Sequence, residues 1–181
     1  PEAPTHVLSS GSAVQVLDSA QRDGMWCGRV SVPLPAAVAM VEDEPVAVTL
    51  PLDLATVPLR HSASIGGRGA TLPVQYCIFA PGSGMSAGEE KSGFAAHPPN
   101  NGRTYADFLL ALPPADSLSL NFSVAIQDGA SASGCTFAVE VNCREETAIK
   151  VDDADGWHPG VVDLSAYAGK TVLLTLLVDS D

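Results

Sequence analysis

Residues 117–126 read SLSLNFSVAI, and in this stretch apolar and polar side chains alternate one by one. The apolar members, which fall on one side, are Leu118, Leu120, Phe122, Val124 and Ile126. Side chains of a β-strand point alternately to the two faces of a sheet, so this pattern predicts a strand with one buried face. Residues 135–143, CTFAVEVNC, repeat the alternation and predict a second strand of the same kind.

Outward from these two stretches, short alternating or β-branched runs recur between turn-forming residues and predict further strands. The full set of expected strands is 13–17, 28–34, 45–52, 72–79, 105–112, 117–127, 135–142, 147–151, 160–164 and 171–178. The 16 glycines and 14 prolines of the chain suit many short strands better than long helices. We therefore predict an all-β fold, an antiparallel β-sandwich of the jelly-roll type.

One helical turn is expected at Ser165–Lys170, within the stretch VVDLSAYAGK. A serine can begin this turn, and Gly169 can end it in a left-handed conformation. Asp163 and Ser165 can cap the turn and Tyr167 can pack its ring, so each residue has a structural use. The stretch therefore indicates the fold and leaves the ligand undefined.

The size and composition of the chain fit an ordered domain. Its 181 residues are 46% hydrophobic and only 17% charged, which favours a packed core over disorder. A change in composition near Leu59 divides the chain into a strand-rich segment, 1–60, and a jelly-roll module, 61–181. The N-terminal segment is expected to be part of the sandwich or appended to it. Two stretches rich in Gly, Ser, Pro and Asn, 61–72 and 80–103, are expected to be loops.

The formal net charge of −12 argues against two classes of partner. An acidic surface repels nucleic-acid phosphates and anionic membranes, and no apolar run approaches the roughly 20 residues of a membrane helix. The first residues lack a basic start and a signal-peptide core. A Pro-rich beginning and an end directly after a strand favour a piece of a larger protein.

Four cysteines, Cys27, Cys77, Cys135 and Cys143, permit two disulfide bonds in any of three pairings. Cys135 and Cys143 lie on one expected strand, and a fully extended chain would separate them by roughly 26 Å. They could pair only if the chain turned between them. Buried, unpaired cysteines are the other interpretation of the same residues.

From about His97 onward the chain resembles the galactose-binding-like jelly-roll accessory modules of bacterial carbohydrate-active enzymes. The resemblance rests on AAHPPNNGRTYADFLLALPPADSLSLNFSVAIQDGASASGCTFAVEVN and GWHPGVVDLSAYAGKTVLLTLLVDSD, of which VDLSAYAGKTV is the most specific part. The chain departs from the pattern at 133–135, SGC, where such modules often carry an acidic residue. The usual Trp-bearing final strand is also absent, which would leave an open edge unless an earlier strand fills the place.

The resemblance implies a non-catalytic, carbohydrate-binding module of a secreted or cell-surface bacterial protein, with neighbouring domains and a polysaccharide or oligosaccharide as partners. Sugars stack their C–H faces on aromatic rings and bond their hydroxyls to polar side chains. The candidate ligand-binding residues are Trp26, Trp157, His97, Asn100, Arg103 and Tyr105. Each tryptophan could instead pack over the edge of the sandwich, and the HPPNNG stretch could simply be a turn.

The stretch VDDADGW places Asp152, Asp153 and Asp155 close together before a glycine. Calcium takes several oxygen ligands, and modules of the resembled kind often hold a structural Ca²⁺, so these residues are candidate metal ligands. A solvated acidic turn is the alternative. No recognised catalytic motif stands out, and we expect no enzyme activity. The rival functions are a structural spacer that packs against a catalytic domain without binding sugar, and a fragment in which 1–60 ends a catalytic domain.

Overall fold

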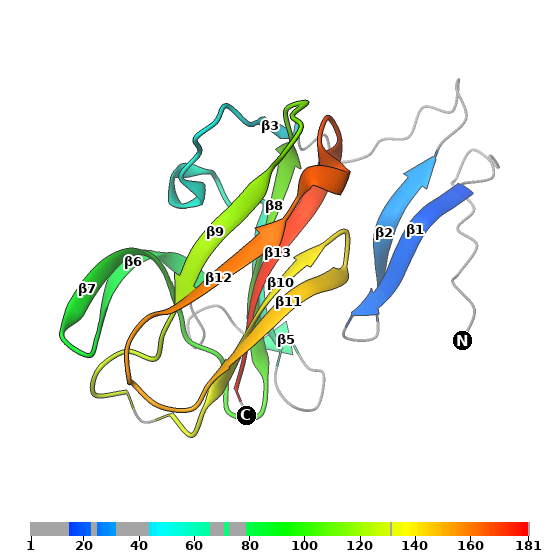
Figure 1. Cartoon of the computed structure of the whole chain (residues 1–181). Coiled ribbons are helices and arrows are strands. Elements are labelled where there is room, and N and C mark those ends of the chain that lie inside the picture. The colour runs from blue at the N-terminus through cyan, green and yellow to red at the C-terminus, as the bar shows by residue number, and fades with distance from the viewer. Residues whose placement is uncertain are drawn as a thin grey trace.

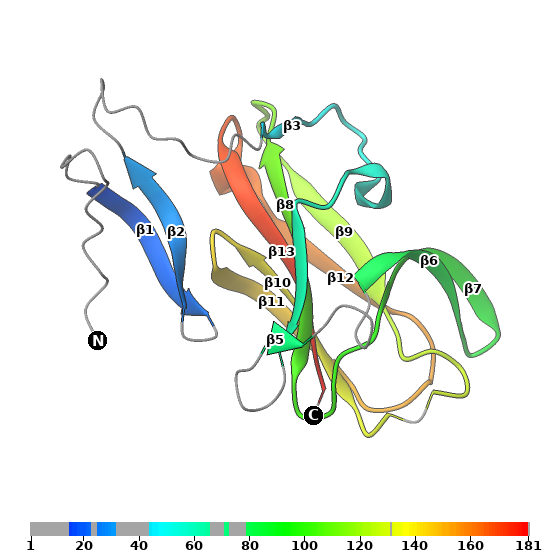
Figure 2. The same cartoon turned by 180° about the vertical axis from the view of Figure 1, so that it is seen from behind.

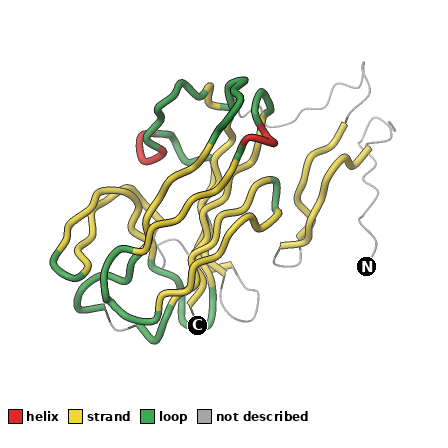
Figure 3. Tube along the Cα trace, in the orientation of Figure 1, coloured by secondary structure: helices red, strands yellow, loops and turns green. Residues whose placement is uncertain are grey.

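The computed structural model describes the backbone of residues 15–22, 25–31, 44–65, 71–72, 79–130 and 132–180. Its strands are β1 (Gln15–Arg22), β2 (Met25–Ser31), β3 (Val46–Ala47), β4 (His61–Ile65), β5 (Thr71–Leu72), β6 (Phe79–Ser86), β7 (Glu89–Ala96), β8 (Arg103–Ala111), β9 (Ser119–Val124), β10 (Cys135–Val141), β11 (Arg144–Val151), β12 (His158–Asp163) and β13 (Thr171–Ser180). Short 3₁₀ turns lie at Leu54–Thr56 and Ser165–Tyr167. Figure 3 shows how strands dominate the trace.

Seven of the described strands form one large sheet in the order β11-β10-β13-β8-β4-β5, with β3 beside β8. β3 pairs with β8 in parallel, and the other pairs of this sheet are antiparallel. Figures 1 and 2 show the sheet from its two sides, with β13 running through its middle. The last strand thus has a partner on both edges, β10 and β8, and does not leave an open edge where it lies.

A second layer covers one face of this sheet. β9 and β12 form an antiparallel pair that crosses over the large sheet (Figure 1). Leu118, Val162 and Leu164 of this layer are buried in the main hydrophobic cluster, together with Phe108 and Leu174 of the large sheet. The prediction of an all-β sandwich is confirmed, while the jelly-roll strand order stays a prediction.

The two faces of the large sheet differ, because its side chains alternate. The inner face, which meets β9 and β12, carries the fully buried Phe108, Val141 and Leu174. The outer face carries Tyr105, Ala138 and Leu177, which belong to a separate small cluster. The alternation predicted within 135–143 is therefore confirmed, with Val139 and Val141 in the main core.

The prediction of a loop at 80–103 is wrong, because most of this stretch forms the β6–β7 hairpin. Ala87 and Gly88 both adopt positive φ, 48° and 77°, as a tight two-residue hairpin turn requires. The two strands consist largely of Gly, Ser and Ala, so the sequence shows no alternation of large apolar side chains that would predict them. Phe94 joins the hairpin to the core, since its ring lies 5.4 Å from that of Phe79 and 5.6 Å from that of Phe108.

Other boundaries also differ from those expected. The loop predicted at 61–72 is wrong in part, because β4 pairs with β8 along its whole length. The strand predicted at 45–52 shrinks to β3, and the following residues pack Leu52, Leu54 and Val57 into the core through a 3₁₀ turn. Of the strand predicted at 72–79, residues 73–78 lie outside the described residues. β1 and β2 form a separate hairpin, shifted from the predicted 13–17 and 28–34.

The predicted helical turn is present as the 3₁₀ turn Ser165–Tyr167. Asp163 Oδ1 accepts a hydrogen bond of 2.8 Å from the Ser165 backbone N–H, and the bonds from the Ser165 side chain and backbone lower the pKa of Asp163. The Ser165 hydroxyl in turn accepts from the Leu118 N–H at 3.0 Å. Gly169 has φ 70°, the left-handed conformation expected of it. The stretch therefore ties β12 and β13 to the start of β9.

Gly160 on β12 is expected to tolerate a side chain poorly, because the ring of Phe122 packs directly over it and would have to shift. A methyl group there would collide with two ring carbons of Phe122 and lie 2.9 Å from Ile149 Cδ1. We predict that Gly160→Ala lowers the free energy of unfolding by about 1–3 kcal/mol, measured by urea denaturation. Gly93→Ala is the matched control, since no atom lies within 4 Å of the place that its methyl group would take. Equal stability of the two variants would contradict the close packing at Gly160.

Candidate functional site

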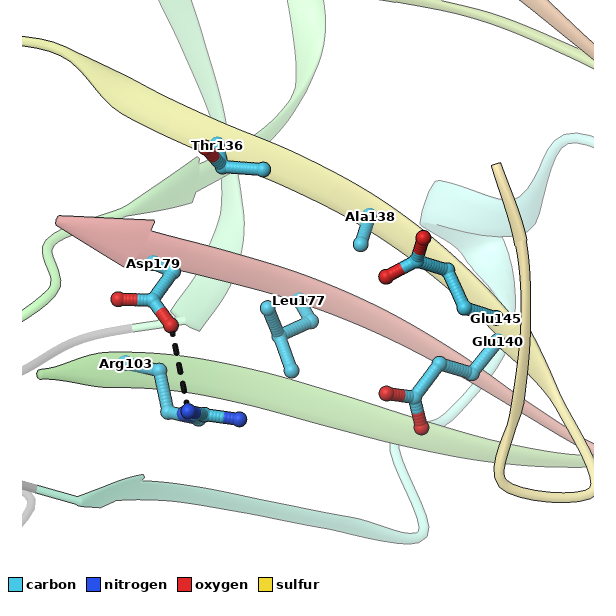
Figure 4. Close-up of a pocket in the computed structure, with 7 residues that line it drawn as sticks. All are labelled: Arg103, Thr136, Ala138, Glu140, Glu145, Leu177 and Asp179. Carbon is cyan, nitrogen blue, oxygen red and sulfur yellow. Dashed lines mark ion pairs between the residues drawn. The ribbon is translucent and has the colours of Figure 1, made fainter. Parts of the chain in front are cut away.

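The outer face of the large sheet carries a hollow of about 320 Å³. Its lining residues come from β8, β10, β11 and β13 and are Arg103, Thr136, Ala138, Glu140, Glu145, Leu177 and Asp179 (Figure 4). Strand pairing explains why they meet: residues directly opposite one another on neighbouring strands point to the same face. Thr136 is opposite Asp179, and Ala138 is opposite Leu177.

The two ends of the hollow differ in charge. At one end Arg103 and Asp179 are cross-strand partners and form an ion pair of 3.4 Å. At the other end Glu140 and Glu145 are cross-strand partners on β10 and β11. Figure 4 shows both glutamate carboxyl groups pointing from that end toward Leu177, which lies between the two ends.

The floor of the hollow is apolar and firmly packed. Ala138 and Leu177 are buried, and they cluster with Ile65 and with Tyr105, of which only 4% is exposed. Charged and hydroxyl groups thus surround a small hydrocarbon patch. Such a surface offers hydrogen-bond donors and acceptors to hydroxyls, together with an apolar contact for C–H groups.

Two of the predicted ligand-binding residues, Arg103 and Tyr105, lie on this face. Arg103 lines the hollow itself. Tyr105 lies two residues further along β8, where its ring belongs to the buried cluster below the lining. Glu140 and Glu145 were not predicted, because on the sequence they look like ordinary polar positions of two strands. Only the pairing of β10 with β11 brings them together.

His97 and Asn100 lie in the turn between β7 and β8, outside the hollow's described lining. Asn100 is exposed, and the next residue, Asn101, has φ 52° as a turn residue. Ser180 holds this turn: its hydroxyl donates to the Pro99 carbonyl at 2.6 Å, and its N–H donates to the Gly102 carbonyl at 2.9 Å. The contacts of this stretch are those of an anchored turn.

Trp157 lies against the β6–β7 hairpin. Its indole N–H donates to the Glu89 carbonyl at 3.0 Å, and Lys91 Nζ lies over the ring, 5.3 Å from the centroid. Gly84, opposite Lys91 on the hairpin, leaves room for the indole edge. Asp128 holds the same hairpin, since its carboxylate accepts from two backbone N–H groups of the turn. Trp157 is therefore half-buried and used in packing.

Trp26, the other predicted aromatic platform, lies on β2 opposite Gln21. Its side chain is outside the described residues.

The acidic turn does not present a converging set of carboxylates. Asp152 forms an ion pair with Lys150 at 3.4 Å, and Asp155 Oδ1 lies 2.8 Å from His158 Nε2. Asp153 is exposed. Among the described residues, no group of three or more His, Cys, Asp or Glu side chains could hold a metal ion. Calcium binding at this turn stays a prediction.

Cys143 is disulfide-bonded and follows β10 in a tight turn, with φ 65°. Because β10 runs without a turn from Cys135 to Val141, the chain does not fold back as a bond between Cys135 and Cys143 would require. Cys135 is buried in the main core.

Comparison with family models, with curated proteins and with solved structures found no match to this chain. Within the described part of the chain, no helix has both the length and the apolar character needed to span a membrane.

Proposed function

We propose that this chain is a non-catalytic β-sandwich module that binds a polysaccharide or oligosaccharide. The observation that supports the proposal is the hollow on the outer face, where polar groups surround the buried floor of Ala138 and Leu177. Its volume of about 320 Å³ is at the lower end of the range for small-molecule sites. The lining described for the hollow lies on one face of the large sheet, where a long polymer could run across several strands.

We expect weak binding by a single module. Affinities from millimolar to micromolar correspond to about −4 to −8 kcal/mol. Attachment to a catalytic domain would raise the effective concentration of substrate, which makes such affinities useful. We therefore place the module beside an enzyme of carbohydrate metabolism in a larger bacterial protein, as the galactose-binding-like resemblance implies.

A secreted or cell-surface location belongs to the same proposal. The disulfide bond at Cys143 supports it, because disulfides persist mainly in oxidising compartments.

Affinity electrophoresis of the whole chain through gels that contain different polysaccharides tests the proposal. We expect at least one polysaccharide to slow the chain, and Arg103→Ala to lower the affinity about tenfold or more. A hydrogen bond from a charged donor contributes about 1.5–3 kcal/mol, which is sufficient for that loss. Lys170→Ala is the matched control. Lys170 lies just before the first residue of β13, whereas Asp179, the ion-pair partner of Arg103, lies near the last.

Two results would contradict the proposal. A folded chain that no polysaccharide retards is not a carbohydrate-binding module. Retardation that Arg103→Ala and Lys170→Ala reduce equally would show binding away from the hollow.

The second candidate function is a structural module that packs against a neighbouring domain without binding sugar. The packing of Trp157 favours it, because this aromatic residue holds the hairpin in place. We predict that Trp157→Ala lowers the free energy of unfolding by about 1–2 kcal/mol, through loss of one hydrogen bond and of half-buried aromatic area. Hydrogen exchange should speed up mainly across residues 79–96.

Met85→Ala is the control for this prediction, since Met85 lies on the same hairpin and is exposed. It should change stability by less than about 0.5 kcal/mol. If Trp157→Ala abolished polysaccharide retardation without loosening the hairpin, Trp157 would be a binding platform and not a packing residue.

A further inference from the structure

Asn101 and Gly102, in the turn between β7 and β8, form a pair with a chemistry of its own. The backbone nitrogen of the residue after an asparagine can attack the side-chain carbonyl carbon, and glycine, which has no side chain, shields its nitrogen least. Asn101 is exposed and has φ 52°, a left-handed conformation that asparagine adopts more readily than most residues do. The carbon that would be attacked thus belongs to a side chain exposed to water.

Ser180, the last residue of β13, holds the other reactant. The N–H of the buried Gly102 donates to Ser180 Oγ at 3.1 Å, and the Gly102 carbonyl accepts from the Ser180 N–H at 2.9 Å. The Ser180 hydroxyl donates in turn to the Pro99 carbonyl at 2.6 Å. A backbone nitrogen must lose its proton and approach the asparagine side chain before it attacks. These hydrogen bonds therefore oppose the reaction until the turn opens locally.

Two other described glycines, Gly129 and Gly156, follow an acidic residue and form similar pairs. The Asp128 carboxylate accepts from two backbone N–H groups of the β6–β7 turn, at 2.9 and 3.1 Å. Asp155 Oδ1 lies 2.8 Å from His158 Nε2. A carboxylate is a poorer electrophile than an amide, and these contacts hold both carboxylates in place. The asparagine pair is therefore the most reactive of the three.

We propose that Asn101 is a site of spontaneous deamidation and that the Ser180 contacts set its rate. The Gly102 nitrogen forms a bond to Asn101 Cγ, and its proton leaves with the side-chain nitrogen as ammonia, so that a five-membered succinimide ring results. Water then opens the ring at either carbonyl group and gives aspartate or isoaspartate. The reaction consumes only water, and the inference is independent of the carbohydrate-binding proposal.

The isoaspartate product would alter the turn as well as its charge. It routes the backbone through the former side chain and adds one carbon between the α-carbon of residue 101 and the Gly102 nitrogen. The Gly102 N–H and carbonyl, which both bond to Ser180, would be displaced from the end of β13. Deamidation would thus release the last residue of a strand that lies inside the large sheet. Hydrogen exchange at the Ser180 N–H should be faster in the isoaspartate form.

Prolonged incubation of the whole chain at mildly alkaline pH, followed by proteolytic digestion and mass spectrometry, tests the inference. We expect the peptide that contains Asn101 to convert first, into aspartate and isoaspartate forms that chromatography separates. The folded wild-type chain should convert about tenfold more slowly than the chain unfolded in urea, because the turn must first break its bonds to Ser180. Ser180→Ala should convert about tenfold faster than the folded wild-type chain, whereas Ser180→Thr, which keeps the hydroxyl, should stay close to wild type.

Ser117→Ala, the same substitution at an exposed residue before β9, is the matched control and should leave the rate unchanged. Urea denaturation shows whether Ser180→Ala is folded, and if it is not, the folded and unfolded wild-type chains alone decide the inference. Equal conversion rates in these two states would overturn the role of Ser180. Conversion of the unfolded chain alone, with none in the folded wild type or in folded Ser180→Ala, would overturn the site. Earlier conversion at Asp128 or Asp155 would also contradict the inference.

Discussion

Replacing Phe108 by alanine is expected to have the largest effect on stability, a loss of about 3–5 kcal/mol from the free energy of unfolding. The ring is 0% exposed, lies on the inner face of β8, and contacts Phe94 of the β6–β7 hairpin. Its removal would open a cavity where the two layers and the hairpin meet. The loss should appear in urea denaturation as a lower midpoint with an unchanged slope.

Val161→Ala is the control for this variant, because Val161 is an apolar β-strand residue that is 63% exposed. It should change stability by less than about 0.5 kcal/mol. A Phe108→Ala loss below about 1 kcal/mol would mean that the hairpin and the two layers do not pack on this ring.

Loss of the disulfide bond at Cys143 should have the second-largest effect, about 2–5 kcal/mol. The bond restricts the unfolded chain, and Cys143 sits in a hairpin turn beside Asn142, which is itself tied to β13. The Asn142 N–H donates to the Leu173 carbonyl at 2.8 Å, and its Oδ1 accepts from the Leu173 N–H at 3.1 Å. We expect Cys143→Ser to lower the urea midpoint accordingly.

A reducing agent provides the matching experiment on the unaltered chain. It should lower the midpoint of the wild-type chain toward that of Cys143→Ser, and peptide mapping without reduction should identify the partner cysteine. A wild-type midpoint that is insensitive to reduction would contradict a stabilising bond at this position.

The sequence predicts the main sandwich well wherever strands carry large alternating side chains. The inner faces of β9 and β10 follow the alternation of Leu118 and Leu120 and of Val139 and Val141. It fails for the β6–β7 hairpin, whose strands are built largely of Gly, Ser and Ala and give no hydrophobic period. Tertiary packing through Phe94, together with the turn at Ala87 and Gly88, decides that structure.

The candidate site could be predicted only in part. Arg103 stands out in the sequence because it follows a turn of polar residues, and it does line the hollow. Glu140 and Glu145 become neighbours only through the register of β10 and β11, in which a shift after Val139 sets the partner of Glu140. A sequence pattern does not specify such a register. The tryptophan in DGWHPG has the surroundings of an aromatic platform in the sequence, yet its indole bonds to the hairpin.

The central place of β13 governs the order in which this domain can be made. β8 pairs with β13 over nine positions, and Asp107 and Thr175, whose side chains bond across the two strands, are 68 residues apart in the chain. During synthesis, the backbone edges of β8 and β10 that pair with β13 stay exposed until residues 171–180 have left the ribosome. Such late, long-range pairing slows folding and exposes nascent chains to aggregation. A chaperone that shields β8 and β10 during that interval is therefore expected to raise the yield of folded protein.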